Sequence, residues 1–233
     1  MVDGGWRGLE YGNAGGEARV DLSGGGGDTG GMGAGLQLGR WLDDRLWLGA
    51  TAEYNSVEVP LRAQHSGVRG NRVQLASRYR FDERRRVGIS YDLGEFNDGN
   101  TRQSVGAFGE QRLLTKPTFK LDARLDLYAS RNTERNTIYY NPEQDFAGSV
   151  TLDNRWRSWR RYDNSFEQRL ALTAGTYSQR GHSSGGTWNV EYGHTWRLGP
   201  RLTLGYGSSH GRHVYDGDRE HETLLLLPLD ARP

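Results

Sequence analysis

The sequence predicts an all-β protein, an antiparallel β-barrel of the kind that spans bacterial outer membranes. Three observations lead to this fold class. Apolar and polar residues alternate with a period of two, short turns alternate with longer loops, and aromatic residues gather at both ends of the apolar face. In 119–130, odd positions carry Phe, Leu and Ala, while even positions carry charged residues, Tyr or Ser. An amphipathic helix would repeat every 3.6 residues instead.

Thirteen strands and no helix are expected. In 70–81 and 85–96, Val, Leu, Ile and Tyr alternate with Arg, Gln, Ser and Asp. In 146–158 and 184–197, Val, Leu and Trp alternate with Thr, Asp, Glu and Arg. The segment 101–113 is the least regular, because Val105, Ala107 and Phe108 depart from strict alternation. The expected strands are 5–11, 17–23, 33–42, 46–56, 70–81, 85–96, 101–113, 118–131, 146–158, 164–178, 184–197, 201–213 and 219–229.

The connections favour a membrane barrel, whose periplasmic turns are short and whose extracellular loops are longer. With this assignment the last strand descends toward the periplasm. Residues 1–16 are interpreted as a partial strand and turn, and 17–233 as the transmembrane β-barrel domain. The expected short turns are 43–45, 82–84, 115–117, 159–163 and 199–200, and the longer loops are 24–32, 57–69, 97–100, 132–145, 179–183 and 214–218.

Composition narrows the classes of protein further. The 233 residues include 30 Lys and Arg against 29 Asp and Glu, and this balance argues against a nucleic-acid-binding surface. No cysteine is present, so disulfides and Cys-ligated metals are not expected. Only 34% of residues are hydrophobic, yet 7 Trp, 12 Tyr and 6 Phe argue against disorder. A polar average suits a barrel in which only alternate residues face lipid.

The N-terminus has no apolar stretch typical of a signal peptide, and no run of about 20 apolar residues could form a spanning helix. The missing signal peptide and the odd strand count predict that the chain is a fragment of a larger barrel.

Aromatic residues on the apolar face form two bands, as in the girdles of membrane barrels. The expected bands are Phe81, Trp156 and Trp196 near the short turns, and Tyr54, Tyr91 and Trp188 near the longer loops.

A soluble antiparallel barrel or sandwich is the alternative, with these aromatic residues in its core. The charged faces of the strands argue against it, because so many charges could not fill a dry core. These charged side chains could instead line a water-filled lumen.

Several segments resemble a known family. The loop 136–146 reads NTIYYNPEQDF, 166–170 reads FEQRL, 177–179 reads YSQ, and 214–217 reads VYDG. Together they resemble the C-terminal barrel of the poly-β-1,6-N-acetyl-D-glucosamine (PGA/PNAG) export porin family of Gram-negative bacteria. The resemblance is best over 118–222, and its most specific part is the Tyr-Tyr-Asn-Pro-x-x-Asp segment.

The resemblance implies a sixteen-stranded barrel in the Gram-negative outer membrane that exports this biofilm exopolysaccharide. It also implies a periplasmic tetratricopeptide-repeat domain, a deacetylase partner, a monomeric pore and no cofactor. The present chain then corresponds to such a barrel without its first strands.

Candidate substrate-path residues follow from the alternation, because they share the polar face that would line the lumen. Carboxylates there would attract the ammonium groups of a partly deacetylated glucosamine polymer and exclude polyanions. The simpler interpretation is that opposed Arg and Asp rows pair across strands and only stabilise the barrel. The lumen candidates are Glu53, Asp92, Asp122, Arg124, Asp126, Tyr128, Asp153, Arg155, Glu167, Arg169 and Glu191, and the pore-mouth candidates are Tyr139, Tyr140, Asn141, Pro142 and Asp145.

Two other functions stay open. A cellulose-type export barrel carries a neutral polymer and should have fewer acidic lumen residues. An outer-membrane lipid-modifying enzyme would need a Ser/His pair on the lipid face, whereas Ser209 and His210 have opposite parity.

Some motifs are expected to be coincidental. The segment 25–30 matches G-x-G-x-x-G without a strand–helix unit around it, and 207–211 matches G-x-S-x-G inside a strand pattern. His210 and His213 have neither the i, i+4 helical spacing nor the neighbouring carboxylates of a zinc site. His194 has outward parity, which is unusual for contact with lipid.

Overall fold

The computed structural model describes residues 5–13, 16–24, 32–56, 68–134, 141–227 and 229–231. Within them the chain is all-β and antiparallel, and no helix is present. The strands are hydrogen-bonded in chain order from β1 to β13, and the short β14 pairs with β12. Their bounds are β1 Gly5–Asn13, β2 Gly16–Gly24, β3 Met32–Trp41, β4 Leu46–Ser56, β5 Gly70–Arg80, β6 Arg85–Phe96, β7 Thr101–Lys116, β8 Phe119–Asn132, β9 Gln144–Arg161, β10 Asn164–Gln179, β11 Gly185–Leu198, β12 Leu202–Tyr215, β13 Asp218–Leu226 and β14 Leu229–Ala231.

All thirteen expected strands are present, including the first. The expected last strand, 219–229, is wrong in one respect. It divides into β13 and β14, which both pair with β12: Leu226 lies opposite Gly207, and Leu229 lies opposite Leu204. Pro228 and the glycine-rich segment 25–30 lie outside the described residues.

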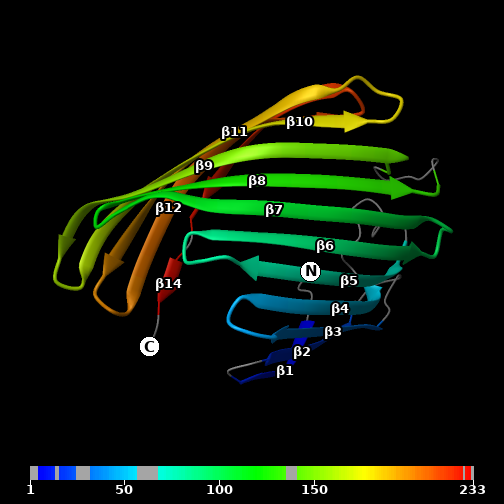
Figure 1. Cartoon of the computed structure of the whole chain (residues 1–233), viewed down its shortest axis with the longest axis horizontal. Helices are drawn as coiled ribbons and strands as arrows, with labels where there is room; N and C mark the ends of the chain where they lie inside the picture. The colour runs from blue at the N-terminus through cyan, green and yellow to red at the C-terminus, as the bar shows by residue number, and fades with distance from the viewer. Residues whose placement is uncertain are drawn as a thin grey trace. The chain divides into compact units, whose positions relative to one another are not determined.

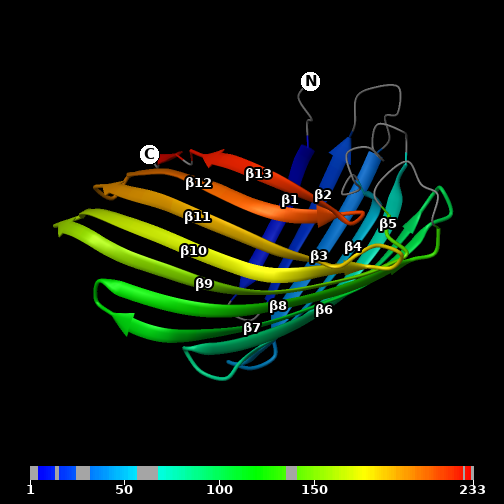
Figure 2. The ribbon, with the colours of Figure 1, turned by 90° about the horizontal axis from the view of Figure 1, so that it is seen from above.

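The chain divides into two compact units, and each is described by itself. One comprises residues 1–107 and 128–145, and the other comprises 108–127 and 146–233. In the first unit β3 to β6 lie side by side in chain order, with antiparallel neighbours (Figure 1). In the second unit β10 to β13 have the same meander arrangement (Figure 2). Such consecutive pairing is what short turns between strands produce.

Each unit presents one apolar and one polar face. In the first unit Leu38, Ala50, Leu75 and Tyr91 lie opposite one another in a row that crosses β3 to β6. Leu38, Leu75 and Tyr91 are exposed, as are most large apolar side chains of both units. A soluble sheet would bury this face, whereas lipid covers it in a membrane barrel. The buried apolar residues in the described part are only Trp47, Val68, Ala171 and Val214.

Two turns between strands are stabilised in the same way, by an aspartate that accepts backbone N–H groups. In the β3–β4 turn, Asp43 Oδ1 accepts the backbone N–H groups of Arg45 and Leu46, each at 2.7 Å. In the β5–β6 turn, Asp82 binds two backbone N–H groups and the Arg85 guanidinium. The Arg85 hydrogen bond is the main reason that the pKa of Asp82 lies below its usual value, and backbone N–H groups lower the pKa of Asp43. These local hydrogen bonds explain why both turns can be tight.

The irregular strand β7 keeps its alternation in the structure. Val105 is exposed on the apolar side, while Phe108 points to the opposite, polar face. There the Arg124 guanidinium lies 4.5 Å from the centre of the Phe108 ring. The expected break in parity is therefore an aromatic residue on the polar face, covered by a cation.

No helix in the described ranges is long and apolar enough to cross a membrane.

Candidate functional site on the polar face

In the first unit, three charged side chains of the polar face meet across neighbouring strands. Arg72 on β5 lies opposite Glu53 on β4. Its guanidinium is 2.6 Å from Asp92 Oδ2 on β6 and 3.9 Å from Glu53 Oε1. Gln74 also donates to Asp92, at 3.3 Å. Two of the predicted lumen acids therefore share one arginine that was not among the predicted site residues.

A larger ionic network occupies the polar face of the second unit. Asp153 on β9 binds Arg155 at 2.8 Å and Arg169 on β10 at 3.0 Å. Arg169 also pairs with Glu191 on β11. The Asp153 side chain is only 14% exposed, so its two arginines replace much of its contact with water. Four predicted lumen residues thus form one connected group that we call the Asp153 network: Asp153, Arg155, Arg169 and Glu191.

Further pairs extend this pattern along the same face of the second unit. Arg124 binds the Asp126 carboxylate through two nitrogens, at 2.7–2.9 Å. It also lies 3.7 Å from Glu110 on β7. Two more cross-strand pairs are Arg112–Asp122 at 2.8 Å and Arg157–Glu167 at 2.6 Å.

The predicted lumen acids are therefore all paired with arginine. An ion pair that remains partly exposed contributes about 0.2–1 kcal/mol, and its oxygens and N–H groups still offer hydrogen bonds. The polar face is thus a wall of alternating charge with many weak hydrogen-bonding positions.

A buried amide cluster lies where β7, β8 and β9 approach the loops. Asn100 is 1% exposed, and its Nδ2 donates to Asn132 Oδ1 at 3.3 Å and to Asn141 Oδ1 at 3.1 Å. Its Oδ1 accepts the Glu134 N–H at 3.2 Å. Asn132 in turn donates to the Pro142 carbonyl oxygen at 2.6 Å. The amide cluster (Asn100, Asn132 and Asn141) therefore fixes both ends of the loop between β8 and β9.

Other predicted residues at this end of the sheet also have partners. The Asp145 carboxylate accepts a hydrogen bond from Ser130, and both side chains are buried. The Tyr128 hydroxyl accepts one from Arg102 at 2.8 Å. Tyr139 and Tyr140 lie outside the described residues.

The turn end of the first unit carries a feature that sequence reasoning missed. Trp47 lies flat across β3 and β4, so that an added Cβ at Gly49 would be 2.1 Å from its ring and one at Gly39 would be 2.9 Å away. Only glycine leaves room for the indole at these two positions. The Arg78 guanidinium lies 4.6 Å from the Trp47 ring centre. The indole is therefore held between backbone and cation.

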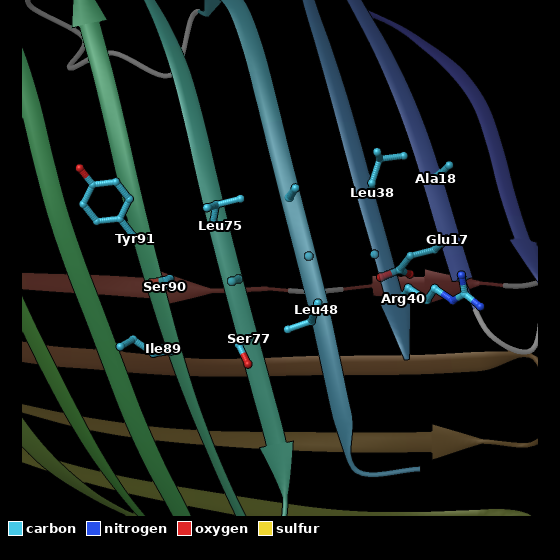
Figure 3. A pocket seen from close by; sticks show the side chains of 15 residues that line it. Glu17, Ala18, Leu38, Arg40, Leu48, Leu75, Ser77, Ile89, Ser90 and Tyr91 are labelled. Atoms are coloured by element: carbon cyan, nitrogen blue, oxygen red, sulfur yellow. The ribbon is translucent and has the colours of Figure 1, made fainter. Parts of the chain in front are cut away.

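The apolar face of the first unit carries a shallow groove. It crosses β2 to β6, and its lining includes Leu38, Leu48 and Leu75 (Figure 3). The small Ala50 lies between Leu38 and Leu75 in the register of the strands. Polar groups contribute little to its lining, which suits contact with acyl chains.

In the second unit the apolar face has a band of aromatic contacts near the turns. Phe166 and Trp196 have ring centres 4.3 Å apart, and Trp156 stacks with Tyr192 at 6.3 Å. His194 lies among these rings, 4.7 Å from Tyr192. Its unusual outward position is explained by this aromatic surrounding, which matches a membrane-interface girdle.

Among the described residues, the candidate catalytic motifs do not have the geometry that catalysis requires. Ser209 donates to Asn189 on the polar face at 2.8 Å, whereas its neighbour His210 binds Thr223 on the apolar face. The G-x-S-x-G match lies within β12, so no nucleophile elbow forms. No group of His, Asp or Glu suited to a metal ion occurs among the described residues.

Comparison with known proteins decides the family. A family model described as the PgaA membrane beta barrel domain matches residues 6–232. The chain belongs to this family.

Named relatives of the PgaA barrel agree with this assignment. The poly-beta-1,6-N-acetyl-D-glucosamine export protein of Escherichia coli K12 is 33% identical over 200 residues, which cover 85% of this chain and 25% of that protein. The protein of the same name from Escherichia coli O157:H7 gives the same values. The chain thus spans about a quarter of the length of these curated relatives. A solved structure of a bacterial polysaccharide outer membrane secretin superposes with a TM-score of 0.88 at 29% identity, covering 98% of this chain and 79% of that one.

Three expectations from the sequence are confirmed by these findings. The chain is an antiparallel barrel domain of the PgaA family, and it is located in the Gram-negative outer membrane. The relatives are longer proteins, so most of their sequence lies outside the matched barrel.

Sequence reasoning missed the partners that complete the ionic wall and the amide cluster. Arg72, Glu110 and Arg112 have the correct parity for the polar face, and that signal was available. Asn100 and Asn132 lie at strand ends, where periodicity gives no signal.

Proposed function

We propose that the chain forms the pore of an export channel for poly-β-1,6-N-acetyl-D-glucosamine and is not an enzyme. The observation that carries the proposal is the polar face, on which every predicted lumen acid is paired with arginine. Such a face needs water and a polar cargo beside it, because it cannot pack against an apolar partner. Membership of the PgaA barrel family supports a polysaccharide as that cargo.

The paired charges suit transport of a polymer. An unpaired row of carboxylates would hold an ammonium-bearing chain tightly, and tight sites would stall it. Paired carboxylates still accept hydrogen bonds from sugar hydroxyl and ammonium groups, and each such exchange is weak. We expect the polymer to advance by replacing one weak contact with the next along the Asp153 network and its neighbours.

The pore mouth is proposed to lie at the loop end of the sheet. The amide cluster holds Asn141 and Pro142, which flank the segment containing Tyr139 and Tyr140. Fixed loop ends would present these tyrosines to the sugar faces of the emerging polymer. A tetratricopeptide-repeat domain in the periplasm, a deacetylase partner and a monomeric pore belong to the same proposal. The greater length of the relatives supports the presence of a further domain.

The proposal is tested by passage of labelled oligosaccharides into liposomes that contain the chain. Partly deacetylated β-1,6-linked glucosamine oligomers should enter faster than β-1,4-linked glucose oligomers of equal length. Changing Asp122, Asp126 and Asp153 together to Asn should lower that preference about tenfold, since three contacts of about 0.2–1 kcal/mol are lost.

The matched control removes three carboxylates from the turns instead, at Asp43, Asp44 and Asp82. This control should retain the preference. Equal entry of both oligomers, or an unchanged preference in the wall variant, would contradict a lumen that selects this polymer.

A further inference from the structure

Basic side chains gather on the apolar face of the second unit, at the loop end of β12 and β13. On that face Arg212 lies opposite Trp188 on β11 and His221 on β13. His210, two residues before Arg212, lies opposite Thr223, and Arg219 follows at the start of β13. We call His210, Arg212, Arg219 and His221 the basic patch.

The basic patch is ordered by contacts among its own members and neighbours. The His210 and His221 rings stack with centres 5.9 Å apart at 18°. Trp188 meets both rings edge-on, at 5.3 Å and 6.0 Å. Arg212 Nε donates to the Gly186 carbonyl oxygen at 3.1 Å, which directs the guanidinium along the strand. The side chains of His210, Arg212 and His221 are therefore positioned before any ligand arrives, and Arg219 is exposed beside them.

The patch has no acidic counterpart on its own face. The alternating positions of β10 to β13 that share this face contain no Asp or Glu, because Glu220 and Glu222 alternate to the other side. Within the described residues neither Arg212 nor Arg219 forms an ion pair. The turn acid Asp216 accepts a hydrogen bond from Gln179 at 2.8 Å.

Below the patch the same face becomes apolar. The next row toward the turns after that of His210 contains Leu170, Tyr192, Ser208 and Leu225, and Leu225 is 80% exposed. The basic patch thus occupies the boundary between the apolar band and the loops. With short turns toward the periplasm, this boundary is the level of the outer-leaflet headgroups. Arginines facing lipid there need an anion, and Trp is typical of the same level.

We propose that the basic patch binds the phosphate groups of an outer-leaflet lipid of the lipid A type. Arg212 and Arg219 supply planar guanidinium donors, which suit phosphate oxygens. His210 and His221 supply ring N–H donors beside them, and Trp188 packs at the base of the headgroup. The acyl chains would then lie on the apolar rows of β10 to β13. This inference rests on the outer-membrane location and is independent of the cargo of the pore.

The test is lipid binding to the detergent-solubilised chain, followed by native mass spectrometry. The probes are bisphosphorylated lipid A, the same lipid without phosphates, and inorganic phosphate as competitor. The variant Arg212→Gln with Arg219→Gln should bind lipid A roughly twentyfold more weakly, since each interfacial cation contributes about fivefold. The control Arg201→Gln, in the turn at the opposite end of β12, should bind within twofold of the unchanged chain.

A second variant separates loss of charge from loss of fold. Arg212→Lys with Arg219→Lys keeps both charges and should retain most of the affinity. The dephosphorylated lipid should bind at least tenfold more weakly than lipid A, and millimolar inorganic phosphate should not displace lipid A. Equal binding of the two lipids, displacement by free phosphate, or unchanged affinity in the Gln variant would overturn the proposal.

Discussion

Replacing Asn100 by leucine is expected to lower the free energy of unfolding by about 3 kcal/mol. The side chain is 1% exposed and bridges Asn132, Asn141 and the Glu134 N–H. Leucine has a similar size but leaves these three groups without that partner, and Asn132 among them is buried. Denaturant titration of the chain in micelles measures the loss, and faster amide exchange at Glu134 should accompany it.

Two further variants make the Asn100 prediction specific. Asn100→Asp keeps the acceptor for the Glu134 N–H but loses both donations, so it should fall between the unchanged chain and the leucine variant. Gln37→Leu alters an exposed amide in the same unit and should change stability by less than about 0.5 kcal/mol. A leucine variant as stable as this control would show that the amide cluster does not hold the loop ends.

Replacing Asp153 by alanine is expected to lower the free energy of unfolding by about 2 kcal/mol. The value lies between the cost for a buried pair, about 3–5 kcal/mol, and that for an exposed pair, below about 1 kcal/mol. Asp153 is 14% exposed and pairs with two arginines. After the substitution Arg169 still has its ion pair with Glu191. Its removal leaves excess positive charge on the wall, so permeability to anions should also rise. Denaturant titration and ion-selectivity measurements test the two effects.

The matched control is Asp163→Ala, at an exposed aspartate in the β9–β10 turn, which should be nearly neutral. Replacing Asp153 by leucine and Arg155 by methionine together should recover part of the stability, because Arg155 is then not left without its acid and Arg169 keeps its pair with Glu191. If Asp153→Ala changes neither stability nor selectivity, the Asp153 network is a surface feature without the role assigned to it.

The strands could be predicted from the sequence because one physical rule acts on nearly every residue. Alternate side chains face lipid or water, so a segment such as β8 reveals both its length and its faces. Phe108 is an exception, because it is an apolar side chain on the polar face, where the Arg124 guanidinium covers its ring. The division of the last strand was missed, because the run of four leucines at 224–227 has no alternation that would mark where β13 ends.

The partners within the site could not be predicted in the same way. Parity places Asp153 and Arg169 on one face, but only the register between β9 and β10 brings them to 3.0 Å. Asn100 and Asn141 are 41 residues apart and lie near loops, where no periodic pattern links them. His210 and His221 likewise became neighbours only through the pairing of β12 with β13.

The most direct test of the export pore is the single-channel conductance of the chain in planar bilayers. The account predicts discrete conductance steps, and partly deacetylated β-1,6-linked glucosamine oligomers should interrupt them reversibly. Fully acetylated oligomers of the same length should interrupt them more briefly, because they lack the ammonium groups that the wall carboxylates bind. A chain that produces no steps, or steps unaffected by either oligomer, would contradict the account.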